Sequence, residues 1–322
     1  MERKTAESRT IDPPAPAGRT AARRWTRRLA AAVGLLVLCA LPVGAAGAAQ
    51  PGAAGSPAGP PLYVSDYGNN RVVTLPADGD QSTVPLDGLL RPTGLAWDAA
   101  GRLYVSDTGN NRVVVLPPDG GEQSVVPAGD LSRPLGLAVD PAGNLFIADS
   151  FNDRIVRVAA DGSGPTVVPT TGLLHPWGLA IAPDGGLYVS DFVNDRVVKV
   201  AADGSGQTTV ATVGLSQPTG LALNAAGDLY VADSGNNRVV KVPAGGGPQT
   251  TVPTTGLSSP LGLALDGSGR LYVADGFNNR VVRVRETGGE QVTLPSTGLN
   301  TPTGLAFPPP TARPPHGPAR IP

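Results

Sequence analysis

The amino-acid sequence predicts an all-β fold, a six-bladed β-propeller, and two recurring phrases carry this prediction. The first reads LYVSD, LFIAD or LYVAD and places its aspartate at intervals of 41 and then 42 residues. The second, P-x-G-L-A, occurs six times at intervals of 42 residues. A period of about 40–45 residues with several short strands per repeat is typical of propeller blades. No repeat shows the periodicity of an amphipathic helix.

Each repeat divides into four strands, as the third one illustrates. GLAVD (136–140) is the innermost strand, NLFIAD (144–149) the second, RIVRV (154–158) the third and PTVVP (165–169) a weaker fourth. The second and third strands carry apolar residues on both faces, which is expected when neighbouring blades cover both sides. The turn after the innermost strand holds a glycine, which suits the positive φ of a short hairpin. This glycine recurs at Gly101, Gly143, Gly185, Gly227 and Gly269.

The two ends of the repeat region predict how the ring closes. The region begins at Leu62, already within a second strand, and ends at 302–307 with a first strand only. Six complete blades result if the two ends share one blade. We therefore expect 304–307 to form the inner strand of the blade begun by 62–73, with Leu305 beside Val64. This closure removes the free sheet edges.

The first 49 residues have the pattern of an export signal. Four arginines, the last two being Arg27 and Arg28, precede an uncharged run over 29–49 in which Ala46 and Ala48 fit an A-x-A cleavage site. The run is also long enough to span a bilayer. Both a cleaved signal peptide and an uncleaved signal anchor stay open, as do the Sec and twin-arginine routes. Both the signal peptide and the signal anchor would place the rest of the chain outside the cytoplasm.

Composition and charge bound the remaining chain. Residues 50–61 predict a linker, and the proline-rich tail 308–322 is expected to be disordered. The single cysteine, Cys39, lies in the apolar run, so cleavage would leave no thiol chemistry. Beyond residue 49 the chain holds 17 basic and 23 acidic residues, a net charge of −6. This surface is a poor fit to nucleic acid, which needs clustered basic residues.

A polar pair recurs in every repeat and predicts a structural role. Asp149 ends one strand and Arg154 opens the next, so the aspartate can cap loop amides and pair with the arginine across the hairpin. A group present six times cannot be one active site. The equivalent pairs are Asp66 and Arg71, Asp107 and Arg112, Asp191 and Arg196, Asp233 and Arg238, and Asp275 and Arg280.

Function is expected where the repeats differ, on either side of the recurring proline and in the loop after the aspartate. Residues that flank the proline enter the innermost strands and should ring one mouth of the central channel. Several aromatic and cationic residues occupy these positions, although the chain holds only 4% aromatics. On one face they would form a binding surface; the alternative is that each ring fills a gap between blades. The candidates are Tyr67, Arg91, Arg133, Phe151, His175, Trp177, Phe192 and Phe277.

The stretch PTGLALNAAGDLYVADSGNNRVVKV (218–242) resembles the NHL repeat family of six-bladed β-propellers. The resemblance covers 62–307 and extends to the extracellular sensor propeller of actinobacterial Ser/Thr kinases, although no kinase motif occurs in the chain. It specifies the fold more than the function, because the family includes ligand sensors, protein-binding scaffolds, RNA binders and some enzymes.

The chain lacks most of the catalytic residues that enzymes of similar fold use. Peptide-amidating lyases use histidine-ligated metal, and the related seven-bladed streptogramin lyases use histidine as a general base. The repeat region holds His175 alone, with His316 in the tail, so a multi-histidine metal site is not expected. Calcium-dependent lactonases place acidic ligands in the channel, but Glu122, Glu286 and Glu290 lie outside the repeat cores.

The sequence therefore favours a non-catalytic, exported binding protein, a sensor or adhesion scaffold, over an enzyme. Its expected partner is an envelope protein, a glycan or a small-molecule ligand, and not nucleic acid. No metal or other cofactor is expected, and the propeller is expected to be monomeric. The chain would be secreted or anchored to the outer face of the cytoplasmic membrane. The alternative is a streptogramin-lyase-like lyase, or another hydrolase, built around His175.

Overall fold

The computed structural model describes residues 59–77, 80–286 and 289–310. The predicted signal or anchor segment (1–49), most of the linker and most of the proline-rich tail, with Cys39 and His316, lie outside the described residues. Over the described ranges, none of the helices has the length and apolar character needed to cross a bilayer.

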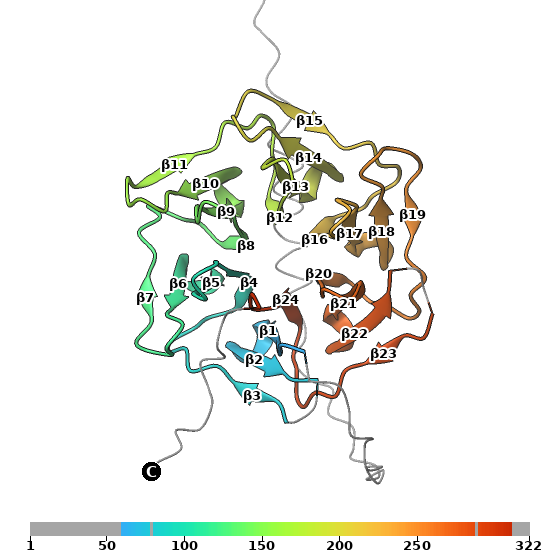
Figure 1. Cartoon of the computed structure of the whole chain (residues 1–322), viewed down its shortest axis with the longest axis horizontal. Helices are drawn as coiled ribbons and strands as arrows, with labels where there is room; N and C mark the ends of the chain where they lie inside the picture. Colours follow the sequence, from blue (N-terminus) through green and yellow to red (C-terminus); the bar gives the residue numbers. More distant parts are fainter. Residues whose placement is uncertain (1–58, 78–79, 287–288, 311–322) are drawn as a thin grey trace, which may run out of the picture. The chain divides into compact units, whose positions relative to one another are not determined.

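Six antiparallel sheets of four strands surround a central axis as blades (Figure 1). From the axis outward, blade 1 holds β24 (Pro302–Ala306), β1 (Leu62–Asp66), β2 (Arg71–Leu75) and β3 (Ser82–Thr83). Blade 2 holds β4 (Pro92–Trp97), β5 (Leu103–Asp107), β6 (Arg112–Leu116) and β7 (Ser124–Val125). Blade 3 holds β8 (Pro134–Val139), β9 (Leu145–Asp149), β10 (Arg154–Val158) and β11 (Pro165–Val167).

The other three blades repeat this order. Blade 4 holds β12 (Pro176–Ile181), β13 (Leu187–Asp191), β14 (Arg196–Val200) and β15 (Gln207–Thr209). Blade 5 holds β16 (Pro218–Leu223), β17 (Leu229–Asp233), β18 (Arg238–Val242) and β19 (Thr250–Thr251). Blade 6 holds β20 (Pro260–Leu265), β21 (Arg270–Asp275), β22 (Arg280–Arg285) and β23 (Val292–Thr293).

Blade 1 closes the ring with strands from both ends of the repeat region. β24 pairs antiparallel with β1, and Leu305 lies opposite Val64 in the register. This confirms the predicted closure and the six-bladed all-β fold. The turn glycines also behave as expected, because Gly101, Gly143, Gly185, Gly227 and Gly269 all have φ between 75° and 84°.

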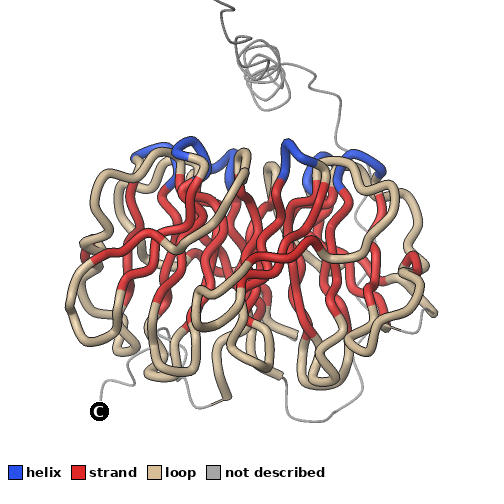
Figure 2. The backbone as a smooth tube through the Cα atoms, turned by 90° about the horizontal axis from the view of Figure 1, so that it is seen from above, coloured by secondary structure: helices blue, strands red, loops and turns tan. Residues whose placement is uncertain are grey.

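The loops between the second and third strands are short 3-10 helices rather than irregular turns. All six lie on one face of the ring, which we call the η face (Figure 2). After each helix, one asparagine or aspartate has a left-handed backbone with φ of 53–56°. These two residue types tolerate this conformation best among residues with a side chain. The helices are η1 (Tyr67–Asn69), η2 (Thr108–Asn110), η3 (Ser150–Asn152), η4 (Phe192–Asn194), η5 (Ser234–Asn236) and η6 (Gly276–Asn278).

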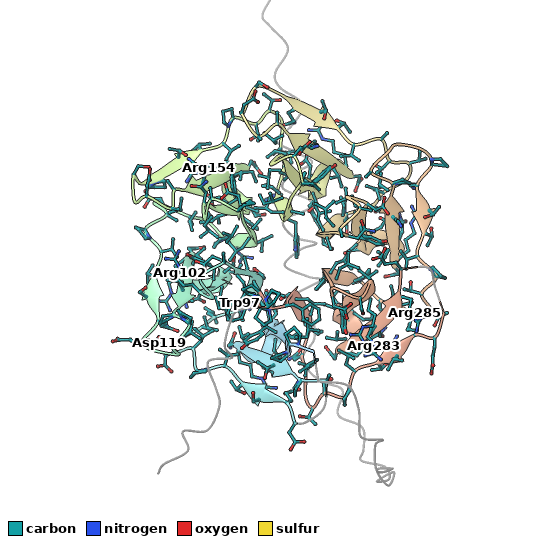
Figure 3. All side chains as sticks on the ribbon, viewed as in Figure 1. Trp97, Arg102, Asp119, Arg154, Arg283 and Arg285 are labelled. Carbon is teal, nitrogen blue, oxygen red and sulfur yellow. The ribbon has the colours of Figure 1, made fainter. Side chains whose placement is uncertain are left out.

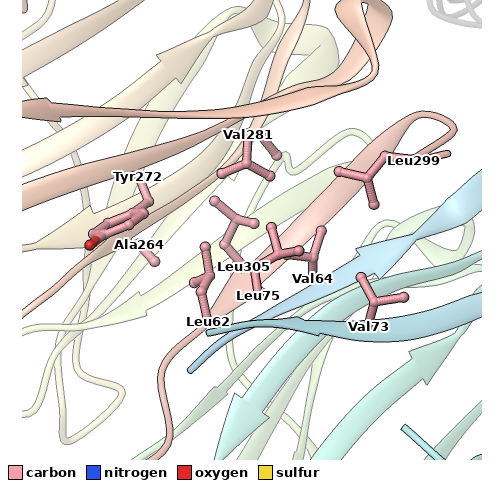
Figure 4. Packing of buried hydrophobic residues seen from close by; sticks show 10 residues of the cluster. Leu62, Val64, Val73, Leu75, Ala264, Tyr272, Val281, Leu299 and Leu305 are labelled. Atoms are coloured by element: carbon pink, nitrogen blue, oxygen red, sulfur yellow. The ribbon is translucent and has the colours of Figure 1, made fainter. Parts of the chain in front are cut away.

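The hydrophobic core lies between neighbouring blades. In one cluster, Val64 and Val73 of blade 1 pack with Tyr272 and Val281 of blade 6 (Figure 4). Since every blade has a neighbour on each side, the apolar residues on both faces of the middle strands are buried. The core therefore joins first and last repeats as it joins any other neighbours.

A ring of six glycines sets the distance between the inner strands. Each is the third residue of its strand, and a Cβ added there would come within 3.0 Å of a backbone carbonyl oxygen in the next blade. Such a short distance is essentially never found for real Cβ atoms. Glycine is therefore required by inter-blade approach, although its own backbone φ is ordinary. The six are Gly94, Gly136, Gly178, Gly220, Gly262 and Gly304.

Burial of Tyr63 predicts alkaline unfolding. The ring is 1% exposed, packs edge-on against Trp97 with centroids 4.9 Å apart, and its burial raises the pKa to about 12. A tyrosine in the unfolded chain ionises near pH 10. The stabilisation is therefore complete below about pH 10 and is lost as the pH rises toward 12. Thermal melts from pH 8 to pH 12 should show a steep fall in Tm that is shallower in Tyr63→Phe; equal slopes would contradict this prediction.

Candidate ligand-binding site

The repeated aspartate is buried and saturated with donors. Asp149 is 0% exposed; its Oδ1 accepts from the backbone N–H of Ser132 at 2.7 Å. Its Oδ2 accepts from Asn152 Nδ2 at 2.8 Å and from Arg154 Nε at 2.7 Å, and Figure 3 shows Arg154 on β10. All six blades repeat this arrangement. These carboxylates are therefore buried and bonded within their own blades, so they are not accessible to a ligand.

The repeated aspartate accepts a hydrogen bond from a different backbone amide than expected, one outside the loop that follows it. The side chain of Asp149 makes no capping bond to η3, the helix that follows it. It bonds instead to Ser132, in the segment that leads into β8 of the same blade. Because β8 runs antiparallel beside β9, with Pro134 opposite Asp149, that entry segment lies next to the carboxylate.

A second set of left-handed residues lies at the blade junctions of the η face. These are the residues before the recurring prolines, with φ of 48–53°. Each donates its backbone N–H to the Oδ1 atom of the left-handed asparagine or aspartate of the preceding blade; for His175 and Asp153 the distance is 2.8 Å. The junctions are therefore built alike, and they differ only in the side chain carried. The six residues are Arg91, Arg133, His175, Gln217, Ser259 and Thr301.

Seven of the predicted site residues lie on four adjacent blades and form three groups of contacting side chains. The guanidinium of Arg133 lies 4.8 Å from the centroid of Phe151, whose ring lies 4.7 Å from that of His175. Arg91 lies 6.0 Å from the centroid of Tyr67. Trp177, two residues after His175, has its ring 5.2 Å from that of Phe192. We call this set the aromatic arc: Tyr67, Arg91, Arg133, Phe151, His175, Trp177 and Phe192.

Two arginines of the arc act on the pKa of Tyr67. Burial raises this pKa, and the positive charges of both Arg91 and Arg133 act against the increase. Tyr67 therefore feels positive charge from the junctions of two different blades, and Arg91 is the one that lies over its ring.

Exposure varies along the arc. Phe192 is 6% exposed and fills a gap, as the alternative interpretation expected, whereas Tyr67, Phe151, His175 and Trp177 are half-buried. Arg91 and Arg133 are exposed. The arc is thus partly packing and partly open surface.

Phe277 is not brought into the arc. It is 41% exposed on η6 of blade 6, and its two junction neighbours are Ser259 and Thr301. In the part of the chain that the structure describes, it makes none of the aromatic contacts found. Phe277 thus occupies the predicted kind of position, on a blade next to Tyr67, but it does not join the contacts of the arc.

The axial cavity is too small for an organic ligand. Its volume is about 70 Å³, whereas ligand pockets span roughly 300–1,000 Å³. The residues before the prolines lie beside the η helices, and most of those after the prolines line this cavity. Trp177 does both, because it lines the cavity and its ring also packs on Phe192, the first residue of η4. Thr219 is instead buried and bonded to Ser234 Oγ at 2.7 Å. The lining includes Thr93, Leu135, Trp177, Leu261 and Thr303.

His175 has a packed ring without an orienting carboxylate. Its Nδ1 atom is buried, with no hydrogen-bond partner among the described residues. The nearby carboxylate of Asp153 accepts from the backbone N–H of His175, not from its ring. Over the same residues, no group of three or more histidine, cysteine or acidic side chains is placed to hold a metal ion.

Residues 89–301, about two thirds of the chain, match the model of the virginiamycin B lyase family. The chain belongs to this family. No curated protein matches it. The match confirms the prediction of a propeller built from repeats. The predicted resemblance to NHL repeats and to kinase sensor propellers is not confirmed.

Solved structures similar to this virginiamycin B lyase family member share its fold. A chain of the nidogen–laminin complex matches with a TM-score of 0.70 and 24% identity, over 77% of this chain and 97% of that one. A streptogramin B lyase matches with a TM-score of 0.57 and 20% identity, over 66% and 72%. A catalytically inactive virginiamycin B lyase from Staphylococcus aureus with quinupristin matches with a TM-score of 0.59 and 17% identity, over 78% and 92%.

Proposed function

We propose that this family member is an exported, non-catalytic binding protein that takes its ligand on the aromatic arc of the η face. The observation that carries the proposal is that these side chains contact one another in groups on four adjacent blades, because a binding surface needs neighbouring anchors rather than scattered ones. Tryptophan, tyrosine and arginine, the residue types enriched at binding hot spots, all occur in it.

The arc has features that packing between blades does not require. Tyr67, Phe151, His175 and Trp177 remain half-buried, and the two arginines are exposed. Blades 5 and 6 close the same ring with Gln217 and Ser259 at the equivalent junctions. Ring closure alone therefore needs neither an aromatic nor a cationic side chain there.

The partner we propose is an envelope protein, a glycan or a small-molecule ligand, met outside the cytoplasm. The net charge of −6 beyond residue 49 argues against nucleic acid. The similar chain of the nidogen–laminin complex supports the idea that this fold can serve a protein assembly. A sensor or adhesion role fits a propeller that is either secreted or held at the membrane by its N-terminal segment.

Trp177→Ala is expected to weaken partner binding by more than about 1 kcal/mol, about fivefold in Kd, because Trp177 is the largest partly exposed anchor of the arc. Partners retained from envelope extract by the purified protein would be identified and their affinity measured by titration calorimetry. Phe277→Ala is the matched control, since this ring lies on the same face but outside the arc. Equal losses in both variants, or retention of nucleic acid alone, would reject the proposal.

A lyase centred on His175 is the second candidate, favoured by membership of the virginiamycin B lyase family. A catalytic base needs its second nitrogen held in place, and Nδ1 of His175 has no such partner among the described residues. Incubation with quinupristin, followed by chromatography, separates the two candidates. Turnover that His175→Ala abolishes without unfolding the protein would establish the lyase, whereas the binding proposal expects no turnover.

A further inference from the structure

We infer that the aromatic arc selects ligands that join an aromatic or apolar body to an oxyanion, a carboxylate or a phosphate. Arg91 and Arg133 would hold the oxyanion, and Phe151, His175 and Trp177 would receive the body. This inference rests on the proposed function, because it names the chemistry of the same site.

The first support is that both arginines lack an acidic partner among the described residues. The arginine that opens each third strand forms an ion pair with the repeated aspartate, as Arg112 does with Asp107 at 2.6 Å. Arg102 and Arg270 are likewise paired, with Asp98 and Asp266. Neither Arg91 nor Arg133 occurs in such a pair, although the body is acidic and carboxylates are plentiful.

The second support comes from the residue beneath each junction. The backbone N–H groups of Arg91 and Arg133 are held by Asn70 and Asn111, which are neutral. At the next two junctions, the same left-handed position holds an acid, Asp153 beneath His175 and Asp195 beneath Gln217. The fold therefore accepts an aspartate at this position.

At the two arginine junctions, an aspartate would add a negative charge beside the backbone of the residue that carries the guanidinium and weaken its attraction for an anion. Neutral residues stand there instead, and the positive charges remain available to a ligand. The charge pattern thus separates the arginine end of the arc from its histidine end, although the backbone is the same at both.

The third support is the way the arginines are presented. Each lies against a ring, Arg91 on Tyr67 and Arg133 on Phe151, and this contact restrains the guanidinium. Restrained donors are suited to the two oxygens of a carboxylate or phosphate. The two arginines stand at neighbouring junctions, before β4 and before β8, so an oxyanion on this part of the η face would meet positive charge from both blades.

Three probes with one ring system test the inference on the full chain by titration calorimetry: naphthoate, naphthyl phosphate and the neutral naphthamide. At least one of the two anions is expected to bind about tenfold tighter than the amide, the usual effect of a charge-assisted bond. The preferred anion tells a carboxylate site from a phosphate site. Added salt should weaken the anion and leave the amide unchanged.

Asn111→Asp is the decisive variant, because it adds an acid beneath Arg133 at a position where the fold already uses aspartate. It should lower anion affinity about fivefold or more and leave amide binding unchanged. Asn237→Asp, beneath Ser259 on the opposite side of the ring, is the matched control with the same charge change, and it should have less than about a twofold effect.

The outcomes distinguish this inference from the proposed function. Equal affinity for the anions and the amide, both weakened by Trp177→Ala, would overturn the oxyanion inference and leave the binding site standing. An equal loss in Asn111→Asp and Asn237→Asp would also overturn it, since net charge alone would then explain the effect. If no probe binds up to its solubility limit, the inference fails, while the test with envelope partners still decides the proposed function.

Discussion

Gly262→Ala is expected to prevent the ring from folding, or to lower the free energy of unfolding by more than about 3 kcal/mol. An added Cβ would come within 3.0 Å of the carbonyl oxygen of Thr303 in the next blade. That oxygen belongs to the backbone of β24, so it cannot move aside as a flexible side chain would. Relief would require blades 6 and 1 to separate at the seam where the ring closes.

Urea unfolding followed by circular dichroism measures the effect on Gly262, and Gly245→Ala is its control. Gly245 is exposed, and an added Cβ there would meet nothing within 4 Å. The control should therefore stay within about 0.5 kcal/mol of the parent. If both variants unfold at the parent's urea concentration, the close approach of the inner strands does not limit the fold.

Asp149→Ala is expected to cost about 3 kcal/mol, the second largest effect. The carboxylate is 0% exposed and accepts three hydrogen bonds, from Ser132, Asn152 and Arg154. Its loss leaves the backbone N–H of Ser132 without its acceptor and removes the buried oxygen that Asn152 and Arg154 share. The same urea experiment measures it, and the loss should appear in the unfolding midpoint with little change in slope.

The control for Asp149 lies in the same loop. Asp153→Asn removes a carboxylate that is exposed, and Asn70, Asn111, Asn237 and Asn279 fill this position in four other blades. Its cost should be below about 0.5 kcal/mol, because the amide oxygen can still accept from the backbone of His175. A parent-like midpoint for Asp149→Ala would show that the repeated aspartate is not a main stabilising group.

The division between frame and site follows from these contacts. Groups present in all six blades, the aspartate and the inner-strand glycine, hold each blade together and set its distance from the next. Groups that change from blade to blade gather at the junctions of the η face. A substitution in the frame is thus expected to act on stability, and one in the arc on binding.

The sequence predicted which residues form the candidate site but not which of them contact one another. Trp177 and Phe151 stand out because aromatic residues are rare in this chain and occur at positions that vary. Whether two such rings touch depends on which blades are neighbours and on where each side chain lies. The contact of Phe151 with His175 and the isolation of Phe277 became visible only in the folded ring.

The sequence by itself determined the number of blades, their four strands and the closure of the ring by 304–307, because a hairpin depends on residues close together in the chain and a fixed period counts the hairpins. Only the tertiary structure decided the distances between blades. These distances require glycine at six inner strands and bring Arg91 of blade 2 onto Tyr67 of blade 1. The physical reason is that spacing between blades is set by packing all six around one axis, which no single repeat encodes.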